Sequence, residues 1–306
     1  MQGQAHLHSR LGLSVPHECW PSAAMLKEIE ASGLSWVQLA SPPPSVLADA
    51  RSCICHARAA ASALEDTGLR RVLHAPSGLL LGDAASDRAL TGAISYAAEC
   101  GAEIVVYHAR AIPDGRGTED RLLAESRSLA ALAPIAERLG VTIALENLAP
   151  VFPGPETISA NPLAVRALAR RIGSPAVGLC LDVGHANVIA GLRRTSLTRM
   201  VEPVLDMVVL FHLHDNLGAR WRPADRRPGL DPLRLDLHLP PGKGTIDWGE
   251  IAISLREHEA PLMMEVHPPR AAPRELVDDA YACLTTIDSR ELPALRQRSI
   301  ASSSAS

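Results

Sequence analysis

The chain has 306 residues, of which 47% are hydrophobic and only 3% aromatic, and its formal net charge is −4. This length and apolar content allow one large α/β domain with a core built mainly from Leu, Val, Ile and Ala. The slightly acidic balance lacks the basic surplus that attracts nucleic acids or anionic membranes. We expect a small-molecule substrate and neither a nucleic acid nor a membrane as partner, although this average charge could conceal a local basic patch and does not settle the point.

Short apolar runs alternate along the chain with longer amphipathic segments. The runs predict buried strands at Leu11–Val15, Trp36–Ala40, Arg71–His74, Ile104–His108, Thr142–Glu146, Val177–Asp182, Val208–Leu213 and Leu262–Val266. The segments between them predict helices at Ala23–Ser32, Ser45–Thr67, Asp87–Cys100, Glu119–Leu139, Pro162–Arg171, Ala186–Val204, Asp247–His258 and Arg274–Asp288. Apolar strands separated by helices predict a parallel sheet covered on both faces. Eight such units predict closure into a single (β/α)8 TIM barrel.

The main competitor is an open doubly wound sheet, which usually has a Gly-rich phosphate turn after its first strand. Ser14-Val15-Pro16-His17 is not such a turn. We assign residues 11–290 to one TIM-barrel catalytic domain, 1–10 to a flexible N-terminus and 291–306 to a disordered tail. An Arg/Pro-rich insertion at 218–241 follows the seventh strand, and a loop of that length is usually functional or disordered.

The start of the chain, from Met1 to Arg10, is polar and lacks the apolar segment of a secretory signal. No apolar run reaches the ~20 residues that span a bilayer. The six cysteines match neither a zinc knuckle nor a disulfide framework, so we expect free thiols. Free thiols fit a reducing compartment, and we predict a cytoplasmic protein.

Side chains of metal-ligand type close six consecutive predicted strands. In a barrel the carboxyl ends of all strands meet at one rim, where reactions take place. Carboxylates buried together there would be costly and would repel one another, and a divalent cation removes both problems. Mixed carboxylates and imidazoles suit zinc, manganese, iron or cobalt better than calcium. The candidates are His74, His108, Glu146, Asp182, His185, His212 and Glu265, with Asp236 and His238 in the insertion.

A single histidine at a strand end is more often a hydrogen-bonded structural residue than a ligand, but six consecutive strand ends favour a shared site. His214, Asp215 and His267 follow the primary candidates closely in sequence. They could support the site or lie in loops instead of binding a metal.

Several short motifs together resemble the xylose-isomerase-like TIM-barrel superfamily. This group includes sugar-phosphate isomerases and epimerases and the endonuclease IV type of apurinic endonuclease. The resemblance extends from about Leu11 to Pro269. The motifs are Leu-His74-Ala-Pro, Ala-Leu-Glu146-Asn, Leu-Asp182-Val-Gly-His185, His212-Leu-His-Asp215-Asn, Asp236-Leu-His238-Leu-Pro-Pro-Gly-Lys-Gly-Thr-Ile-Asp247-Trp248 and Met-Glu265-Val-His.

The resemblance implies a metal site, because the superfamily's shared ligands fall on Glu146, Asp182, His212 and Glu265. The endonuclease type has further ligands that hold additional zinc ions. They match His74, His108, His185, Asp236 and His238. The site is expected to hold one divalent metal, or as many as three, and manganese, zinc, cobalt and iron all remain open.

The first function that the resemblance implies is a sugar or sugar-phosphate isomerase or epimerase. One metal would stabilise an enediolate while Glu146 and Glu265 take and return a proton. His185 would bind a substrate hydroxyl. Arg220 or Arg222 could hold a phosphate or hydroxyl, although a solvated loop is an equal alternative for both.

The second function is a zinc-dependent phosphodiester hydrolase with a multinuclear site, either like endonuclease IV or acting on a small molecule. Asp236 and His238 favour it, because an enediolate mechanism has no need of a second metal. The loop after His74 has no aromatic residue to insert into a duplex, so a DNA substrate is less favoured. A metal-binding barrel without catalysis is a third alternative. Barrels of this kind often form homo-oligomers, and the sequence leaves that open.

Overall fold

The computed structural model describes residues 6–16, 20–109, 117–150, 157–219, 235–267 and 272–285. Eight parallel strands close into a barrel in the order β1 to β8, which confirms the predicted (β/α)8 fold. The strands are β1 (Leu11–Ser14), β2 (Trp36–Ala40), β3 (Arg70–His74), β4 (Ile104–His108), β5 (Thr142–Glu146), β6 (Val177–Asp182), β7 (Val208–Leu213) and β8 (Leu262–Met264).

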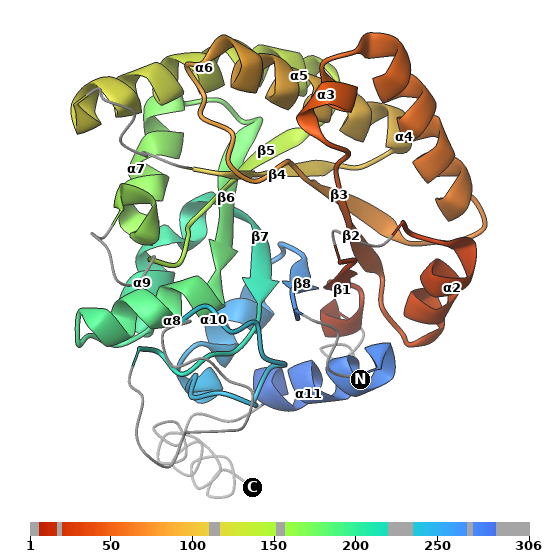
Figure 1. Cartoon of the computed structure of the whole chain (residues 1–306). Helices are drawn as coiled ribbons and strands as arrows, with labels where there is room; N and C mark the ends of the chain where they lie inside the picture. Colours follow the sequence, from red (N-terminus) through yellow and green to blue (C-terminus); the bar gives the residue numbers. More distant parts are fainter. Residues whose placement is uncertain are drawn as a thin grey trace, which may run out of the picture.

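Helices surround the strands as an outer ring (Figure 1). They are α2 (Ala23–Ala31), α3 (Pro44–Leu47), α4 (Ala50–Leu64), α5 (Ala84–Cys100), α6 (Thr118–Arg138), α7 (Pro162–Ile172), α8 (Val183–Leu192), α9 (Thr198–Val201), α10 (Ala252–Glu257) and α11 (Pro273–Thr285). Short 3₁₀ turns lie at η1 (Ile158–Ala160), η2 (Glu202–Met207) and η4 (Trp248–Glu250).

The barrel interior is a small apolar cluster that is separate from the larger core between strands and helices. Its members include Trp36, Val72, Val106, Ala144, Cys180, Leu210 and Met263. Side chains alternate across a strand, so the residue two positions later points to the same face. Those later residues are Gln38, His74, His108, Glu146, Asp182, His212 and Glu265. The apolar cluster is therefore the floor beneath a layer of polar side chains at the carboxyl ends of the strands.

Strand register holds this polar layer at one level. His108 is paired with Glu146 across β4 and β5, and Asp182 is paired with His212 across β6 and β7. Parallel pairing of this kind fixes the relative height of neighbouring side chains. The ligand candidates therefore meet at one end of the barrel, as the sequence predicts.

Several element boundaries differ from the prediction, and two of the differences have a clear local reason. The helix expected at Ser45–Thr67 is divided into α3 and α4, because Asp49 ends the first and caps the second by accepting from the amide of Ser52 at 2.8 Å. Asp182 caps α8 in the same way, so this helix begins at Val183, immediately after β6. The strand expected at Leu262–Val266 ends at Met264, which leaves Glu265 just beyond it.

The structure describes only part of the segments for which the sequence predicts free thiols, flexible ends and an insertion. Cys53, Cys100, Cys180 and Cys283 are buried free thiols and Cys55 is an exposed one, whereas Cys19 lies outside the described residues. Residues 6–10 contain two buried side chains, Leu7 and Arg10. Most of the insertion, residues 220–234, and the expected tail lie outside the described residues, so the domain boundaries stay a prediction. Within the described ranges, no helix is both long and apolar enough to cross a membrane.

Candidate metal centre

The first ligand group consists of Glu146, Asp182, His212 and Glu265. Each side chain offers one ligand atom, and these atoms lie within 4.8 Å of one another. Nδ1 of His212 is 3.5 Å from Oε1 of Glu146, 3.8 Å from Oδ2 of Asp182 and 3.2 Å from Oε2 of Glu265. All four side chains are buried. The structure therefore brings the predicted primary ligands together, with three carboxylates and one imidazole.

The second group consists of His74, His108 and Glu146. Nε2 of His74 lies 3.3 Å from Oε2 of Glu146, and Nε2 of His108 lies 3.2 Å from the same oxygen. Glu146 is therefore common to two groups, and each group faces a different oxygen of its carboxylate.

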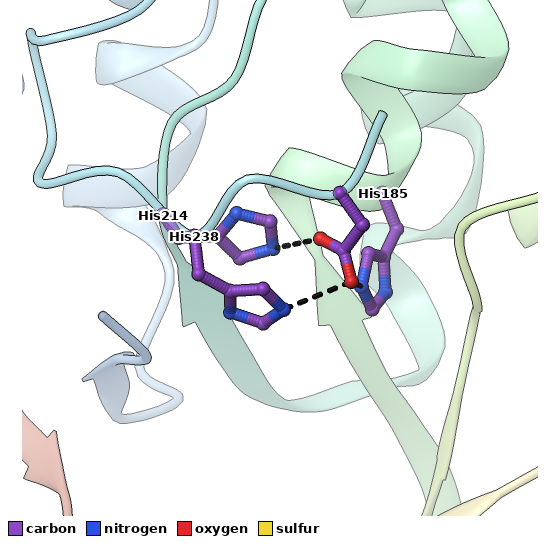
Figure 2. A group of neighbouring side chains, drawn as sticks. His185, His214 and His238 are labelled. Atoms are coloured by element: carbon purple, nitrogen blue, oxygen red, sulfur yellow. Dashed lines mark hydrogen bonds and ion pairs between the residues drawn. The ribbon is translucent and has the colours of Figure 1, made fainter. Parts of the chain in front are cut away.

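The third group consists of His185, His214, Asp236 and His238. Figure 2 shows the three imidazoles close together, and each has a nitrogen within 3.7 Å of a carboxylate oxygen of Asp236. Nε2 of His238 is 2.9 Å and Nε2 of His185 is 3.4 Å from Oδ2 of Asp236. Nε2 of His214 is 3.7 Å from Oδ1 of the same side chain. The two residues of the insertion thus join His185 of α8 and His214, which follows β7 directly. His214 is a member that the sequence left uncertain.

Hydrogen bonds at the outer nitrogen of four imidazoles fix which nitrogen faces the site. An oxygen acceptor requires that the outer nitrogen carries a proton, so in the neutral imidazole the inner nitrogen keeps the free lone pair that a metal needs. Second contacts of this kind orient the histidine ligands of metal sites. The acceptors are the carbonyl of Ala75 for His74, the carbonyl of Asn147 for His185, the carbonyl of Glu265 for His238, and Oε1 of Gln38 for His212, each at 2.8 Å.

Gln38 is a site residue that sequence reasoning missed. It is buried on β2, where its Oε1 accepts from Nε2 of His212 and its Nε2 donates to Ser14 Oγ at 3.2 Å. The same amide nitrogen lies 3.5 Å from Oε1 of Glu265. Gln38 therefore orients two ligands at once. The sequence feature that could have pointed to Gln38 is its polar side chain within the otherwise apolar strand Trp36–Ala40.

The residues fit a divalent cation, because buried polar atoms at the centre lack protein partners. Oε2 of Glu146, Oδ2 of Asp182 and Nδ1 of His212 are buried without a hydrogen-bond partner among the described residues. Leaving such atoms unsatisfied costs roughly 1–3 kcal/mol each, and more for charged groups. A cation accepts lone pairs from both carboxylates and imidazoles, so it satisfies the whole set.

Electrostatics within the centre favour ionised carboxylates. Burial alone would raise the pKa of Glu146, but the imidazoles of His108 and His212 hold that pKa well below its usual value. Burial also acts to raise the pKa of Glu265, but the imidazole of His212 holds that pKa well below its usual value. Glu146 and Glu265 are therefore anionic at neutral pH, which is the form that binds a metal.

Two residues that the sequence left uncertain differ in their surroundings. Asp215 is fully buried and accepts hydrogen bonds from the amides of Asn216, Gly242 and Ile246, so it braces the loop after β7. Burial raises the pKa of its carboxyl. His267 lies beside the site, with its Nε2 3.9 Å from Oε1 of Glu265. Arg220 and Arg222, the expected substrate contacts, lie outside the described residues.

The fold and the site together define a (β/α)8 barrel with a buried carboxylate–imidazole centre at the carboxyl ends of its strands. The chain belongs to the xylose isomerase-like TIM barrel family, whose model matches residues 26–287. This confirms the resemblance seen in the sequence motifs. No curated protein matches the chain.

Solved structures of the same fold include sugar epimerases. A D-tagatose 3-epimerase-like protein has a TM-score of 0.71 and 21% identity, over 92% of this chain and 99% of that one. A D-psicose 3-epimerase, solved in the presence of D-fructose, has a TM-score of 0.63 and 14% identity, over 94% and 98%. The TTHB071 protein of Thermus thermophilus, soaked with ZnCl₂, has a TM-score of 0.63 and 22% identity, over 90% and 97%. At these identities the likeness establishes the fold.

Proposed function

We propose that this chain is a divalent-metal-dependent hydrolase of phosphate esters that works with more than one metal ion. The observation that carries the proposal is the position of Glu146, whose two carboxylate oxygens face two different ligand groups. A carboxylate shared in this way is typical of neighbouring metal ions, and phosphatases and nucleases use such pairs.

The same position argues against Glu146 as an acid or base. Its Oε2 lies within 3.3 Å of the inner nitrogens of His74 and His108, and the side chain is only 1% exposed. A proton acceptor must come within reach of the substrate C–H, directly or through one water. Both oxygens of Glu146 contact ligand nitrogens, which makes Glu146 better suited to metal binding than to proton transfer.

The candidate metal ligands form groups that would have different chemical roles. The centre formed by Glu146, Asp182, His212 and Glu265 offers three anionic oxygens, and His74 and His108 extend it on one side. Bound divalent ions would lower the pKa of a water and neutralise charge on a phosphoryl group. Asp236 and His238 extend the centre on the other side, where they fit a role in holding the leaving oxygen.

A second candidate is the sugar or sugar-phosphate isomerase or epimerase. It is favoured by the titles of the structural neighbours, which name a D-tagatose 3-epimerase-like protein and a D-psicose 3-epimerase. In that mechanism Glu146 and Glu265 exchange the proton, His185 binds a hydroxyl, and Arg220 or Arg222 holds a phosphate. Glu265 suits this role better than Glu146, because the contacts of its Oε1 within the described part of the chain include the longer ones of 3.5 Å with Gln38 and 3.9 Å with His267.

Metal counting and two activity assays separate the candidates. Protein loaded with zinc or manganese is tested on p-nitrophenyl phosphate and bis(p-nitrophenyl) phosphate, and on ketoses in D₂O for solvent deuterium incorporation. Hydrolysis with two or three metals per chain supports the hydrolase. One metal per chain with deuterium exchange supports the epimerase and overturns our proposal. Bound metal without turnover on either class favours a non-catalytic barrel.

A double variant sharpens the test. Asp236→Ala with His238→Ala should remove one metal equivalent and most of the turnover of a multinuclear hydrolase. An epimerase with one metal should keep that metal. The matched control is His6→Ala with Glu259→Ala, an exposed imidazole–carboxylate pair 4.0 Å apart at the amino end of the barrel. The control should leave both metal content and turnover unchanged.

A further inference from the structure

We propose that Asn147 and Asn216 are positioning residues, which hold the first turn of α8 from two sides and thereby set the distance between two groups of candidate metal ligands. The inference rests on the metal centre of the proposed function, but it concerns how that centre is held, not which reaction follows. Asn147 is 1% exposed and Asn216 is fully buried.

The turn between β6 and α8 carries ligands of two groups. Asp182 is the last residue of β6 and caps α8, where its Oδ1 accepts the backbone amide of His185 at 2.7 Å. No loop separates the strand from the helix, because α8 begins at Val183. Asp182 belongs to the first ligand group and His185 to the third. The path of this one turn therefore sets the separation of the two groups.

Asn147 holds the turn from the side of β5. It follows Glu146, the last residue of that strand. Its side chain pairs with the backbone of Asp182: Nδ2 donates to the carbonyl at 3.0 Å, and Oδ1 accepts from the N–H at 2.9 Å. Its own backbone carbonyl accepts from Nδ1 of His185 at 2.8 Å. One residue therefore contacts both ends of the turn.

Asn216 holds the turn from the side of β7. Its Nδ2 donates to the carbonyl of Gly184 at 2.7 Å. Its Oδ1 accepts from Nδ2 of Asn187 and from the N–H of Gly218, each at 2.9 Å. Its backbone carbonyl accepts from the N–H of Thr245 at 2.9 Å. Asn216 thus ties the start of α8 to the loop after β7 and to the segment that precedes η4.

The turn also packs closely against the residue that follows β7. A methyl group at Gly184 would collide with the imidazole of His214. The Nε2 atom of this imidazole lies 3.0 Å from Oδ1 of Asp182. The glycine permits this close approach, and the hydrogen bonds of the two asparagines maintain it. A small shift of the turn therefore moves a ligand.

Amide chemistry explains why an asparagine occupies position 147. The side chain must present a donor to the carbonyl of Asp182 and an acceptor to its N–H at the same time, and an amide offers both. A leucine of similar shape would leave two buried backbone groups unpaired, which is costly. An aspartate would place an oxygen against the carbonyl of Asp182.

The competing explanation is that the two asparagines only stabilise the fold. Stability alone predicts a lower free energy of unfolding and unchanged metal binding in protein that remains folded. Positioning predicts weaker metal binding as well, because partners that orient ligands commonly change metal affinity by about 10- to 100-fold. It also predicts an altered coordination geometry, which the visible absorption of bound cobalt reports.

The main experiment compares two variants of the full-length protein. Asn147→Leu removes both bonds to the backbone of Asp182. Arg10→Met, the matched control, removes a buried guanidinium that donates to three backbone carbonyls near the end of α10, immediately before β1. Both changes leave buried backbone groups unpaired, so urea unfolding should show both variants to be less stable.

Metal binding then separates the two variants. We expect Asn147→Leu to bind zinc and cobalt about 10- to 100-fold more weakly, measured by competition with a chromogenic chelator, and to change the visible spectrum of the cobalt-loaded protein. Arg10→Met should keep the wild-type affinity and spectrum. Wild-type affinity and spectrum in folded Asn147→Leu, or the same losses in Arg10→Met, would overturn the proposal.

Two further variants cover the case in which Asn147→Leu does not fold. Asn147→Ser keeps one hydroxyl, which can serve only one of the two backbone groups of Asp182, so it should give a smaller change in the same direction. Asn216→Leu removes the bond to Gly184 and should also weaken binding and alter the cobalt spectrum. A wild-type spectrum and affinity in either variant would refute the positioning role of that asparagine.

The readouts are metal affinity and the cobalt spectrum, so they do not depend on a substrate. If the protein hydrolyses no phosphate ester but Asn147→Leu binds metal weakly with an altered spectrum, the proposed function fails and this inference stands. If phosphate esters are hydrolysed but Asn147→Leu binds metal as the wild type does, the inference fails and the function stands.

Discussion

The carboxylate of Asp215 accepts a hydrogen bond at 3.1 Å from the indole nitrogen of Trp248, the first residue of η4. Asp215 also pairs through its backbone with Leu239 as an isolated antiparallel bridge. His238 immediately precedes this bridge, and its φ angle of 46° is unusual for a residue with a side chain. The buried carboxylate and the bridge therefore hold His238 in place without binding the metal themselves.

Replacing Asp215 should weaken both the fold and one metal position. Asp215→Asn places an amide NH₂ against several N–H donors, so we expect the free energy of unfolding of the metal-free protein to fall by about 2–3 kcal/mol. Zinc content at the His238 position should fall although no ligand is removed. Urea unfolding and metal analysis measure the two effects. Equal stability of Asp215→Asn and the wild type would refute the bracing role.

Glu146→Gln should affect two ligand groups at once. The amide cannot present two anionic oxygens, so we expect a loss of more than one metal equivalent and a fall in turnover of at least about 100-fold. Glu265→Gln should also abolish turnover but should leave the His74–His108 group able to bind. Metal content and steady-state rates measure both variants, and circular dichroism verifies the fold. Glu259→Gln, an exposed carboxamide, is the control, and full activity in either site variant would remove the site assignment.

Gln38 should tune metal affinity without binding the metal. Gln38→Leu removes the acceptor that holds the proton on Nε2 of His212, so Nδ1 no longer remains reliably free as a ligand. We expect metal affinity at this position to fall about 10- to 100-fold, as measured by competition with a chromogenic chelator. Ser14→Ala disturbs only the other end of Gln38 and should have a smaller effect. If Gln38→Leu binds metal as tightly as the wild type, Gln38 does not orient His212.

Metal removal should destabilise the protein. Without a cation, Oε2 of Glu146, Oδ2 of Asp182 and Nδ1 of His212 stay buried without a hydrogen-bond partner in the described ranges. A ligand that binds only the folded state at 100 times its dissociation constant stabilises that state by about 2.7 kcal/mol. Dialysis against a chelator should therefore lower the melting temperature by about 5 °C or more, and zinc or manganese should restore it. Glu146→Gln should show little of this response. Scanning calorimetry measures the shift, and a wild-type melting temperature indifferent to chelator and metal would argue against a resident ion.

The sequence predicted the barrel well because buried parallel strands must be apolar on both faces. The runs at Ile104–His108, Thr142–Glu146 and Val177–Asp182 match the observed strands residue for residue. Boundaries were less accurate where a single side chain caps a helix, as Asp49 does for α4. A cap depends on the geometry of one residue, and this information is absent from the hydrophobic pattern.

The sequence predicted most of the residues of the candidate site. It did not predict how these residues divide into separate ligand groups. A charged or imidazole side chain at the end of an apolar strand is costly alone, so Glu146 and Asp182 could be recognised from their positions. Gln38 was missed, because one amide in a strand is ordinary and its two contacts reach 174 and 227 residues along the chain.

The amino-acid order by itself determined the fold class and which residues reach the rim, because side chains alternate on each strand and strand ends converge in any closed barrel. Only the tertiary structure decided that Glu146 faces two groups, that His214 joins a third, and that Asp215 braces a loop. Those outcomes depend on distances between side chains from distant segments, which strand register and loop packing set and which no local pattern contains.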